Sequence, residues 1–255
     1  MPRAAGLDFE EHGGGHPGPP LVLIHGAGGS RLHWPPSLRR LDGARTLAVD
    51  LPGHGRSPGP GEASVEDFSQ RLRDWRRAVG LSLPVLVGHS MGGAIALAWA
   101  LAEPAQVAGL VLIGSAARIR VNPVLLEEAS RSETFPVAVE RILSWSYASE
   151  VDPRLIELAR RRLIEAGAQV LATDLAACDA FDVRHRLGEI QLPTTIVVGR
   201  QDRMTPLKLC EELRAGIVGA RLEIVEAAGH MVIQEQPGAV AGSLGNFLGG
   251  LARQA

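Results

Sequence analysis

The chain has 255 residues, which fits one large domain or one domain that carries an insertion. Apolar residues make up 45% and charged residues 21%, values that are typical of a globular protein with a full hydrophobic core. A formal net charge of −2 gives no reason to expect a nucleic acid or an anionic membrane as a partner.

The cysteine content and the N-terminal sequence indicate the cellular compartment in which the protein is expected. Two cysteines, Cys178 and Cys210, are too few for a disulfide framework and favour a reducing environment. The first 20 residues lack the apolar core of a signal peptide, and no run of about 18 apolar residues could span a bilayer. We therefore expect a cytoplasmic protein that does not bind membranes.

Six short apolar runs predict buried strands. Their apolar residues are continuous instead of alternating, which is typical of a parallel sheet covered by helices on both faces. The runs are LVLI (21–24), TLAV (46–49), PVLV (84–87), GLVLI (109–113), TTIVV (194–198) and RLEIV (221–225).

Helical spacing separates these runs. Residues 91–102, MGGAIALAWALA, are apolar nearly all round, as expected of a helix buried against a sheet. Alternating strands and helices predict right-handed crossovers and an open α/β sheet. A second helix is predicted over residues 65–79, where one apolar stripe is formed by Val65, Phe68, Leu72, Trp75 and Val79.

The alternation stops between about residues 118 and 189. Four helical patterns follow one another there, and Pro123, Pro136 and Pro153 each stand where a first helical turn would begin. We interpret this block as a helical cap inserted into the α/β core. An independent helical domain is disfavoured, because the strand pattern resumes at once after the block. The predicted core comprises residues 1–117 and 191–255, and the predicted cap comprises residues 118–190.

The segment GHSMGG (88–93) directly follows the run PVLV and matches the G-x-S-x-G pattern of a strand–turn–helix elbow. Catalytic groups of open α/β sheets collect at the carboxyl ends of the strands. Gly88 and Gly92 lack a Cβ, so the strand and the helix can approach each other closely. We predict that Ser90 projects above the sheet as a nucleophile, where the helix N-terminus favours negative charge.

A serine becomes nucleophilic only when a base accepts its proton, and an acid must hold that base. His230 follows the last run and Asp202 follows the run before it. The order Ser90, Asp202, His230 is the one expected of this elbow chemistry. The loop after GLVLI carries no carboxylate, and we expect the rival acid Glu226 to face outward.

Two His-Gly strings could form a backbone cradle for a negative oxygen. The oxyanion of a tetrahedral intermediate needs two N–H donors. HGAGG (25–29) follows the first run at its carboxyl end, so the Ala27 amide is one predicted donor, and Met91, after the nucleophile, supplies the other. HGGG (12–15) precedes that run and lies at the opposite end of the sheet, where it predicts only a turn.

Five motifs resemble those of the α/β-hydrolase superfamily, and the likeness covers nearly the whole chain. They are HGAGGS (25–30), DLPGHGRS (50–57), GHSMGG (88–93), GRQD (199–202) and AAGHMVIQEQP (227–237). The capped, single-domain serine-esterase branch fits best. The resemblance implies a nucleophile, a general base that later acts as acid, an orienting acid and two oxyanion donors, which are Ser90, His230, Asp202, Ala27 and Met91.

The remaining histidines of these motifs have structural interpretations. The resemblance implies that Asp50 and His54 belong to a scaffold loop. His25 and His89 are expected to brace loops through hydrogen bonds, and contact with the substrate is the less favoured alternative for both.

The cap is expected to determine substrate choice. Trp145 is the predicted wall of the substrate pocket, whereas the arginines at 160–162 predict a solvated helix face. His33 is expected at the surface or facing the cap, and His185 at the end of the cap.

The predicted reaction is acyl transfer. Ser90 attacks a carbonyl, an alcohol leaves with a proton from His230, and water then cleaves the acyl-enzyme. We expect a carboxylesterase with a small apolar pocket that accepts esters of short to medium acyl groups, such as aryl acetates and butyrates. No His–carboxylate metal cluster and no G-x-G-x-x-G after a strand occur in the sequence, so no metal and no cofactor are expected.

Several alternatives stay open. Lactonases and C–C bond hydrolases use the same triad, and a cofactor-free haloperoxidase or perhydrolase activity is a known side reaction of such sites. A non-catalytic ligand receptor on the same fold is disfavoured by the complete triad. A serine at the elbow argues against epoxide hydrolases and haloalkane dehalogenases, which have aspartate there.

Overall fold

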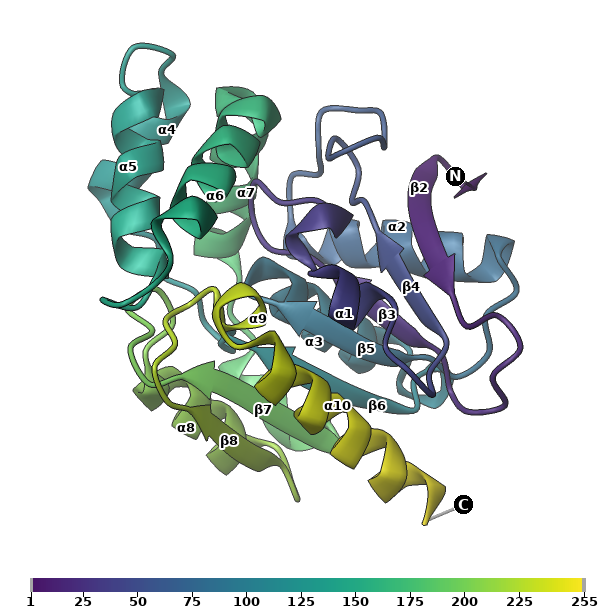
Figure 1. Cartoon of the computed structure of the whole chain (residues 1–255). Helices are drawn as coiled ribbons and strands as arrows, with labels where there is room; N and C mark the ends of the chain where they lie inside the picture. Colours follow the sequence, from purple (N-terminus) through teal and green to yellow (C-terminus); the bar gives the residue numbers. More distant parts are fainter. Residues whose placement is uncertain (1, 254–255) are drawn as a thin grey trace.

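The computed structural model describes residues 2–253 and has one central sheet between two layers of helices (Figure 1). In this part of the chain the sheet has eight strands in the order β1-β2-β4-β3-β5-β6-β7-β8. β1 and β2 pair antiparallel, β2 also runs antiparallel to β4, and all other neighbours are parallel. The strands are β1 (Arg3–Ala4), β2 (Leu7–His12), β3 (Leu21–Ile24), β4 (Thr46–Val49), β5 (Val85–His89), β6 (Gly109–Ile113), β7 (Thr194–Gly199) and β8 (Arg221–Val225). The predicted open, mostly parallel sheet is confirmed.

Each of the six apolar runs forms a strand, and all but the last are fully buried. The expectation of two buried faces is wrong for β8, because this strand forms the edge of the sheet and Ile224 is 37% exposed. The sequence prediction also omitted β1 and β2. The sequence LDFEEH has no continuous apolar run, because the second half of β2 is partly or fully exposed and carries charged residues.

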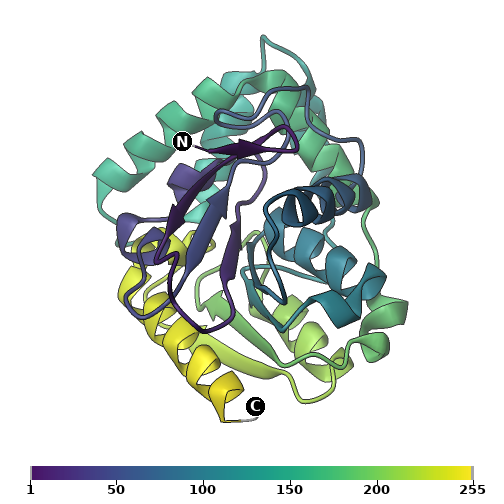
Figure 2. The same cartoon turned by 90° about the vertical axis from the view of Figure 1, so that its right-hand side faces the viewer.

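Helices cover both faces of the sheet (Figures 1 and 2). On one face lie α2 (Val65–Ala78), α3 (Met91–Ala102) and α8 (Leu207–Gly216). The other face carries α1 (Pro36–Arg39), α9 (Val232–Glu235) and α10 (Pro237–Ala252). None of the helices within residues 2–253 combines the length and the apolar character needed to cross a membrane.

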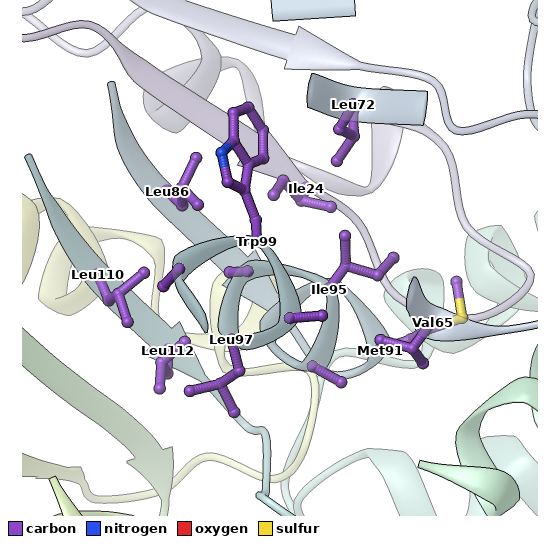
Figure 3. Close-up of a cluster of buried hydrophobic side chains, with 14 of the residues drawn as sticks. Ile24, Val65, Leu72, Leu86, Met91, Ile95, Leu97, Trp99, Leu110 and Leu112 are labelled. Atoms are coloured by element: carbon purple, nitrogen blue, oxygen red, sulfur yellow. The ribbon is translucent and has the colours of Figure 1, made fainter. Parts of the chain in front are cut away.

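The predicted apolar helix, α3, lies at the centre of the core (Figure 3). Ile95, Leu97 and Trp99 are fully buried, and Figure 3 shows Trp99 on the side of Leu86 of β5 and Leu97 on the side of Leu112 of β6. The stripe predicted for α2 is also confirmed, since four of its residues are fully buried: Val65, Phe68, Leu72 and Trp75. Val79, the fifth, is half-buried and stands just after the end of the helix.

Between β6 and β7 lie α4 (Pro123–Ser130), α5 (Phe135–Ser146), α6 (Pro153–Ala166) and α7 (Ala168–Ala180), which we call the cap. A short 3₁₀ helix (Arg184–Glu189), which includes the exposed His185, follows them. The predicted prolines stand in the first turns of α4, α5 and α6, and the side chains of Asn122 and Asp152 cap α4 and α6. The cap has its own apolar cluster and lies over the carboxyl ends of the strands (Figure 1). The domain boundaries at 118 and 190 stay a prediction.

A buried ion pair attaches the cap to the core. Asp174 of α7 and His54 are both fully buried, and Asp174 Oδ2 lies 2.7 Å from His54 Nε2. Asp174 Oδ2 also accepts a hydrogen bond of 2.7 Å from the Gly28 N–H of the loop after β3. His54 Nδ1 lies 2.8 Å from the Pro52 carbonyl oxygen. Since both ring nitrogens face acceptors, the geometry favours a protonated imidazole.

The electrostatic environment of His54 agrees with this protonation. Burial opposes the charged form, but the hydrogen bond and the charge of Asp174 outweigh it and raise the pKa of His54 above its ordinary value. His54 therefore has a definite structural role, because it links the core loop at 50–57 to α7 of the cap.

The arginine run on α6 is only partly solvated. Arg160 and Arg161 pair with Glu157 on the exposed face, as the prediction of a solvated surface requires. Arg162 contradicts that prediction, because it is half-buried and donates a hydrogen bond of 2.8 Å to the Leu32 carbonyl. Arg162 therefore lies on the side of α6 that faces the core loop around Leu32.

The buried stripe of α2 leads to a stability prediction. Leu72→Ala is expected to lower the free energy of unfolding by about 2–5 kcal/mol, because the side chain is 0% exposed and its removal leaves a cavity. Leu158→Ala on α6 makes the same chemical change at a side chain that is 36% exposed, and should cost about 0.5 kcal/mol or less. Urea unfolding measures both, and equal losses would contradict the assignment.

The His54–Asp174 pair leads to a pH prediction. Because the folded-state pKa of His54 is raised, its protonation stabilises the fold below about pH 6.5. This contribution is lost as the pH rises through the raised value. Asp174→Asn is therefore expected to cost about 3 kcal/mol at pH 6 and clearly less at pH 9. Urea unfolding at the two pH values measures the difference, and a cost that is independent of pH would refute it.

Candidate active site

Ser90 stands in the turn between β5 and α3 with a φ of 54° and a ψ of −120°. Such a conformation is costly for a residue with a side chain, so the surroundings must enforce it. They do so by close backbone packing: a Cβ on Gly88 would lie 2.2 Å from the Gly92 carbonyl oxygen, and one on Gly92 would lie 2.2 Å from the Ile24 oxygen. The Ser90 N–H donates to the Ile113 carbonyl at 2.9 Å, which fixes the turn further.

The structure brings His230 and Asp202 together. His230 Nδ1 lies 2.9 Å from Asp202 Oδ2, and both side chains are buried. The Thr205 hydroxyl donates to the same oxygen at 2.9 Å, while the Met204 and Thr205 N–H groups donate to Asp202 Oδ1 at 2.9 and 2.8 Å. With Nδ1–H committed to the carboxylate, Nε2 is the nitrogen of His230 that remains to accept a proton.

These contacts keep Asp202 ionised. Burial alone would favour the neutral acid, but the charge of His230 and the hydrogen bonds from His230 and Thr205 outweigh it and lower the pKa of Asp202. The rival acid Glu226 is exposed and pairs with Arg200 at 2.7 Å, so its predicted outward orientation is confirmed.

Ser90 and His230 line one cavity of about 70 Å³, which we call the small cavity. Its wall includes Ala27, and the loop at 25–29 packs directly on the serine, since a Cβ on Gly26 would lie 3.0 Å from Ser90 Cβ. Within residues 2–253 the structure shows no hydrogen bond from the N–H of Ala27 or of Met91. Both N–H groups are thus unoccupied donors: Met91 follows Ser90 in the chain, and the loop that carries Ala27 packs against Ser90.

The second His-Gly string lies at the other end of the sheet. His12 pairs with Thr46 at the start of β4, whereas the loop at 25–29 follows the last residue of β3. The interpretation of residues 12–15 as a turn agrees with this position.

A second cavity of about 340 Å³, the large cavity, meets the small one at Ser90. The two share Ala27, Ser90, Leu175 and Met204 in their walls. Trp145, the predicted pocket wall, lines the large cavity, and the Arg141 guanidinium lies 5.6 Å from the centre of its ring.

Three histidines near the serine differ in position. His25 is fully buried and accepts the Leu51 N–H at 3.1 Å, and it lines neither cavity, so the structure supports only its bracing role. His89 lines the small cavity and donates through Nε2–H to the His230 carbonyl at 2.9 Å. His33 was expected at the surface or facing the cap; it is buried and lines the small cavity.

The small cavity is therefore bordered by neutral imidazoles. Burial and the neighbouring His230 lower the pKa of His89 to about 3. Burial and the charge of Arg162 lower the pKa of His33 to about 3. Because neither ring is charged at neutral pH, the small cavity favours an uncharged group.

Two supporting residues were missed by the sequence interpretation. Thr205 hydrogen-bonds to Asp202, and its position three residues after the acid is the only local signal for it. Glu235 accepts the N–H of Gly229 at 2.9 Å and that of Ala148 at 2.7 Å, which joins the loop of His230 to the cap. No group of three or more His, Cys, Asp or Glu side chains among residues 2–253 could hold a metal ion.

Comparisons with known proteins agree with this architecture. The chain is similar to a 2-hydroxy-6-oxononadienedioate/2-hydroxy-6-oxononatrienedioate hydrolase of Paraburkholderia phymatum, with 31% identity over 90% of this chain and 86% of the relative. Among solved structures, a thermophilic esterase shares 33% identity and a TM-score of 0.81 over 91% of this chain and 90% of that one. The enol-lactonase of Burkholderia xenovorans LB400 shares 25% identity and a TM-score of 0.87 over 95% and 96% of the two chains.

The family comparison covers both sides of the cap. The match to the alpha/beta hydrolase family extends over residues 21–243, from the first parallel strand into the last helix. The chain belongs to the alpha/beta hydrolase family, and it is a hydrolase whose fold is a mostly parallel sheet with a helical insertion.

Proposed function

We propose that this protein is a serine carboxylesterase that cleaves esters of small to medium acyl groups through an acyl-enzyme. The observation that carries the proposal is a single arrangement: Ser90, held at positive φ, lines one cavity with His230, and His230 is hydrogen-bonded to a buried, ionised Asp202. The esterases among the solved relatives support the same chemistry.

Each residue of this arrangement has a defined part in the proposed mechanism. His230 Nε2 takes the proton of the Ser90 hydroxyl as its oxygen attacks the ester carbonyl. The negative oxygen that forms accepts hydrogen bonds from the Ala27 and Met91 N–H groups. His230 then gives its proton to the leaving alcohol, and water repeats the attack on the acyl-enzyme. Asp202 keeps the proton of His230 on Nδ1 and stabilises the imidazolium without itself becoming protonated.

In the proposed complex, the alcohol part of the ester occupies one cavity and the acyl part occupies the other. His230 must deliver a proton to the leaving oxygen, so the alcohol lies in the small cavity, which His230 lines. For scale, an apolar cavity of about 150 Å³ holds one benzene molecule. A volume of about 70 Å³ therefore suits a methyl or ethyl group and disfavours the aryl esters expected from the sequence. The acyl chain lies in the large cavity of about 340 Å³.

Cleavage of a C–C bond or of a lactone is the second candidate. Two relatives favour it, the hydrolase of 31% identity named above and the enol-lactonase structure. Their reactions also pass through an attack on a carbonyl, so the same arrangement would serve. The haloperoxidase and receptor alternatives have no supporting observation among the relatives described.

Two substitutions test the proposed roles. Ser90→Ala is expected to lower kcat by about 10⁶-fold, because the nucleophile is lost. Asp202→Asn should lower it by about 10⁴-fold, because the tautomer of His230 is no longer held. Steady-state kinetics with a methyl ester measures both. Glu226→Gln, which removes the outward-facing carboxylate of the same region, is the control and should retain full activity.

The outcome that refutes the assignment is specific. If Asp202→Asn retained near-full kcat while Ser90→Ala lost it, another group would have to orient the base. Circular dichroism of both variants separates a lost catalytic group from a lost fold.

A substrate panel tests the reaction class. Methyl and ethyl esters of acids with two to six carbons should be cleaved faster than an enol-lactone and a vinylogous 1,5-diketone. Initial rates of product formation measure the panel. Faster turnover of the lactone or of the diketone would overturn the esterase assignment in favour of the second candidate.

A further inference from the structure

Two arginines line the large cavity without a protein partner. Arg120 stands in the loop between β6 and α4, and Arg203 in the loop that follows β7. Both are exposed and belong to the wall that also contains Ser90. Within residues 2–253 neither guanidinium takes part in a hydrogen bond or an ion pair.

Neighbouring arginines in the same two loops behave differently. Arg118 donates to the carbonyl oxygens of Asp179 and Phe181 at 2.6 and 3.2 Å. Arg200 pairs with Glu226 at 2.7 Å. Each loop thus carries one arginine with a protein partner and one that faces the cavity without a partner.

The charge of the large cavity is one-sided. No acidic side chain lines it, so Arg120 and Arg203 are its only charged groups among the residues described. The carboxylates of the adjoining segments have other partners: Asp179 accepts the Val121 N–H at 3.0 Å, and Asp202 faces His230. A positive cavity in a protein of net charge −2 favours an anionic ligand.

We propose that the large cavity binds an acyl chain that ends in a carboxylate, so that the preferred substrates are half-esters of dicarboxylic acids. This inference rests on the esterase function proposed above. Leu125, Trp145 and Leu175 give the cavity an apolar wall for the methylene chain. The two guanidinium groups then offer charge-assisted hydrogen bonds to the terminal carboxylate.

Matched esters isolate the terminal charge. The probes are monomethyl half-esters of the dicarboxylic acids from glutarate to suberate, each paired with the amide that replaces its free carboxylate. The two members of a pair have the same length and the same reacting ester, so their ratio of kcat/KM reports on the charge alone. For the best length we expect the anion to be preferred about fivefold to tenfold, a modest ratio because exposed arginines are screened by solvent.

The arginines are then removed singly and together. Arg120→Gln and Arg203→Gln should each lower the preference, and the double variant should bring the ratio close to one because kcat/KM falls more for the anion than for the amide. Arg200→Gln is the matched control, because it removes the same charge from the same loop at a residue that already pairs with Glu226. It should leave the ratio at the wild-type value.

The result that overturns the inference is a wild-type ratio at or below one for every length, or a ratio that the double variant does not change. Amides cleaved as fast as anions would leave the esterase proposal standing and refute only the carboxylate subsite. Binding to the Ser90→Ala protein by calorimetry decides the inference even if no ester is cleaved. Monomethyl adipate should bind more tightly than its amide there, and equal affinities would refute the subsite independently of turnover.

Discussion

The close backbone contact between β3, β5 and α3 is the constraint on which the rest of the site depends. Gly88 and Gly92 allow main-chain atoms to approach to distances that any Cβ would block. The chain therefore reverses within a few residues, and Ser90 takes the φ of 54° that lifts it above the sheet. The same contact places the first amide of α3 beside the serine and the loop at 25–29 against it. The proposed nucleophile and the two proposed oxyanion donors are therefore positioned by one packing contact.

Loops of the core and helices of the cap together give this arrangement its chemical environment. Buried neutral histidines border the small cavity, whereas two unpaired arginines border the large one. Segments of the core and of the cap contribute to both walls, and Glu235 joins the loop of His230 to the cap at Ala148. The proposed catalytic groups therefore all come from the core, whereas both cavities are closed by side chains of the core and of the cap together.

Features that depend on local sequence could be predicted, and features that depend on tertiary contacts could not. The buried strands and the elbow around Ser90 carry continuous apolar runs or a short motif, so single segments were sufficient to find them. β2 could not be found because its pairing with β4 compensates for its charged residues. The burial of His33 and the inward turn of Arg162 arise only when α6 and the loop of residues 30–34 meet. Thr205 and Glu235 matter through partners that are folded beside them.

The link from Asp174 to His54 and Gly28 restricts how the cap of this protein can be exchanged with that of a relative. Asp174 and His54 are 120 positions apart in the chain, yet each leaves a buried charge unmatched if the other is replaced alone. A transplanted cap without a carboxylate at this position would leave the buried, cationic His54 without its counter-charge. The loop that carries Ala27 would also lose the hydrogen bond that Gly28 donates to Asp174. The cap and the loop at 50–57 therefore form one structural unit, and a chimaera that takes them from different relatives should fold poorly.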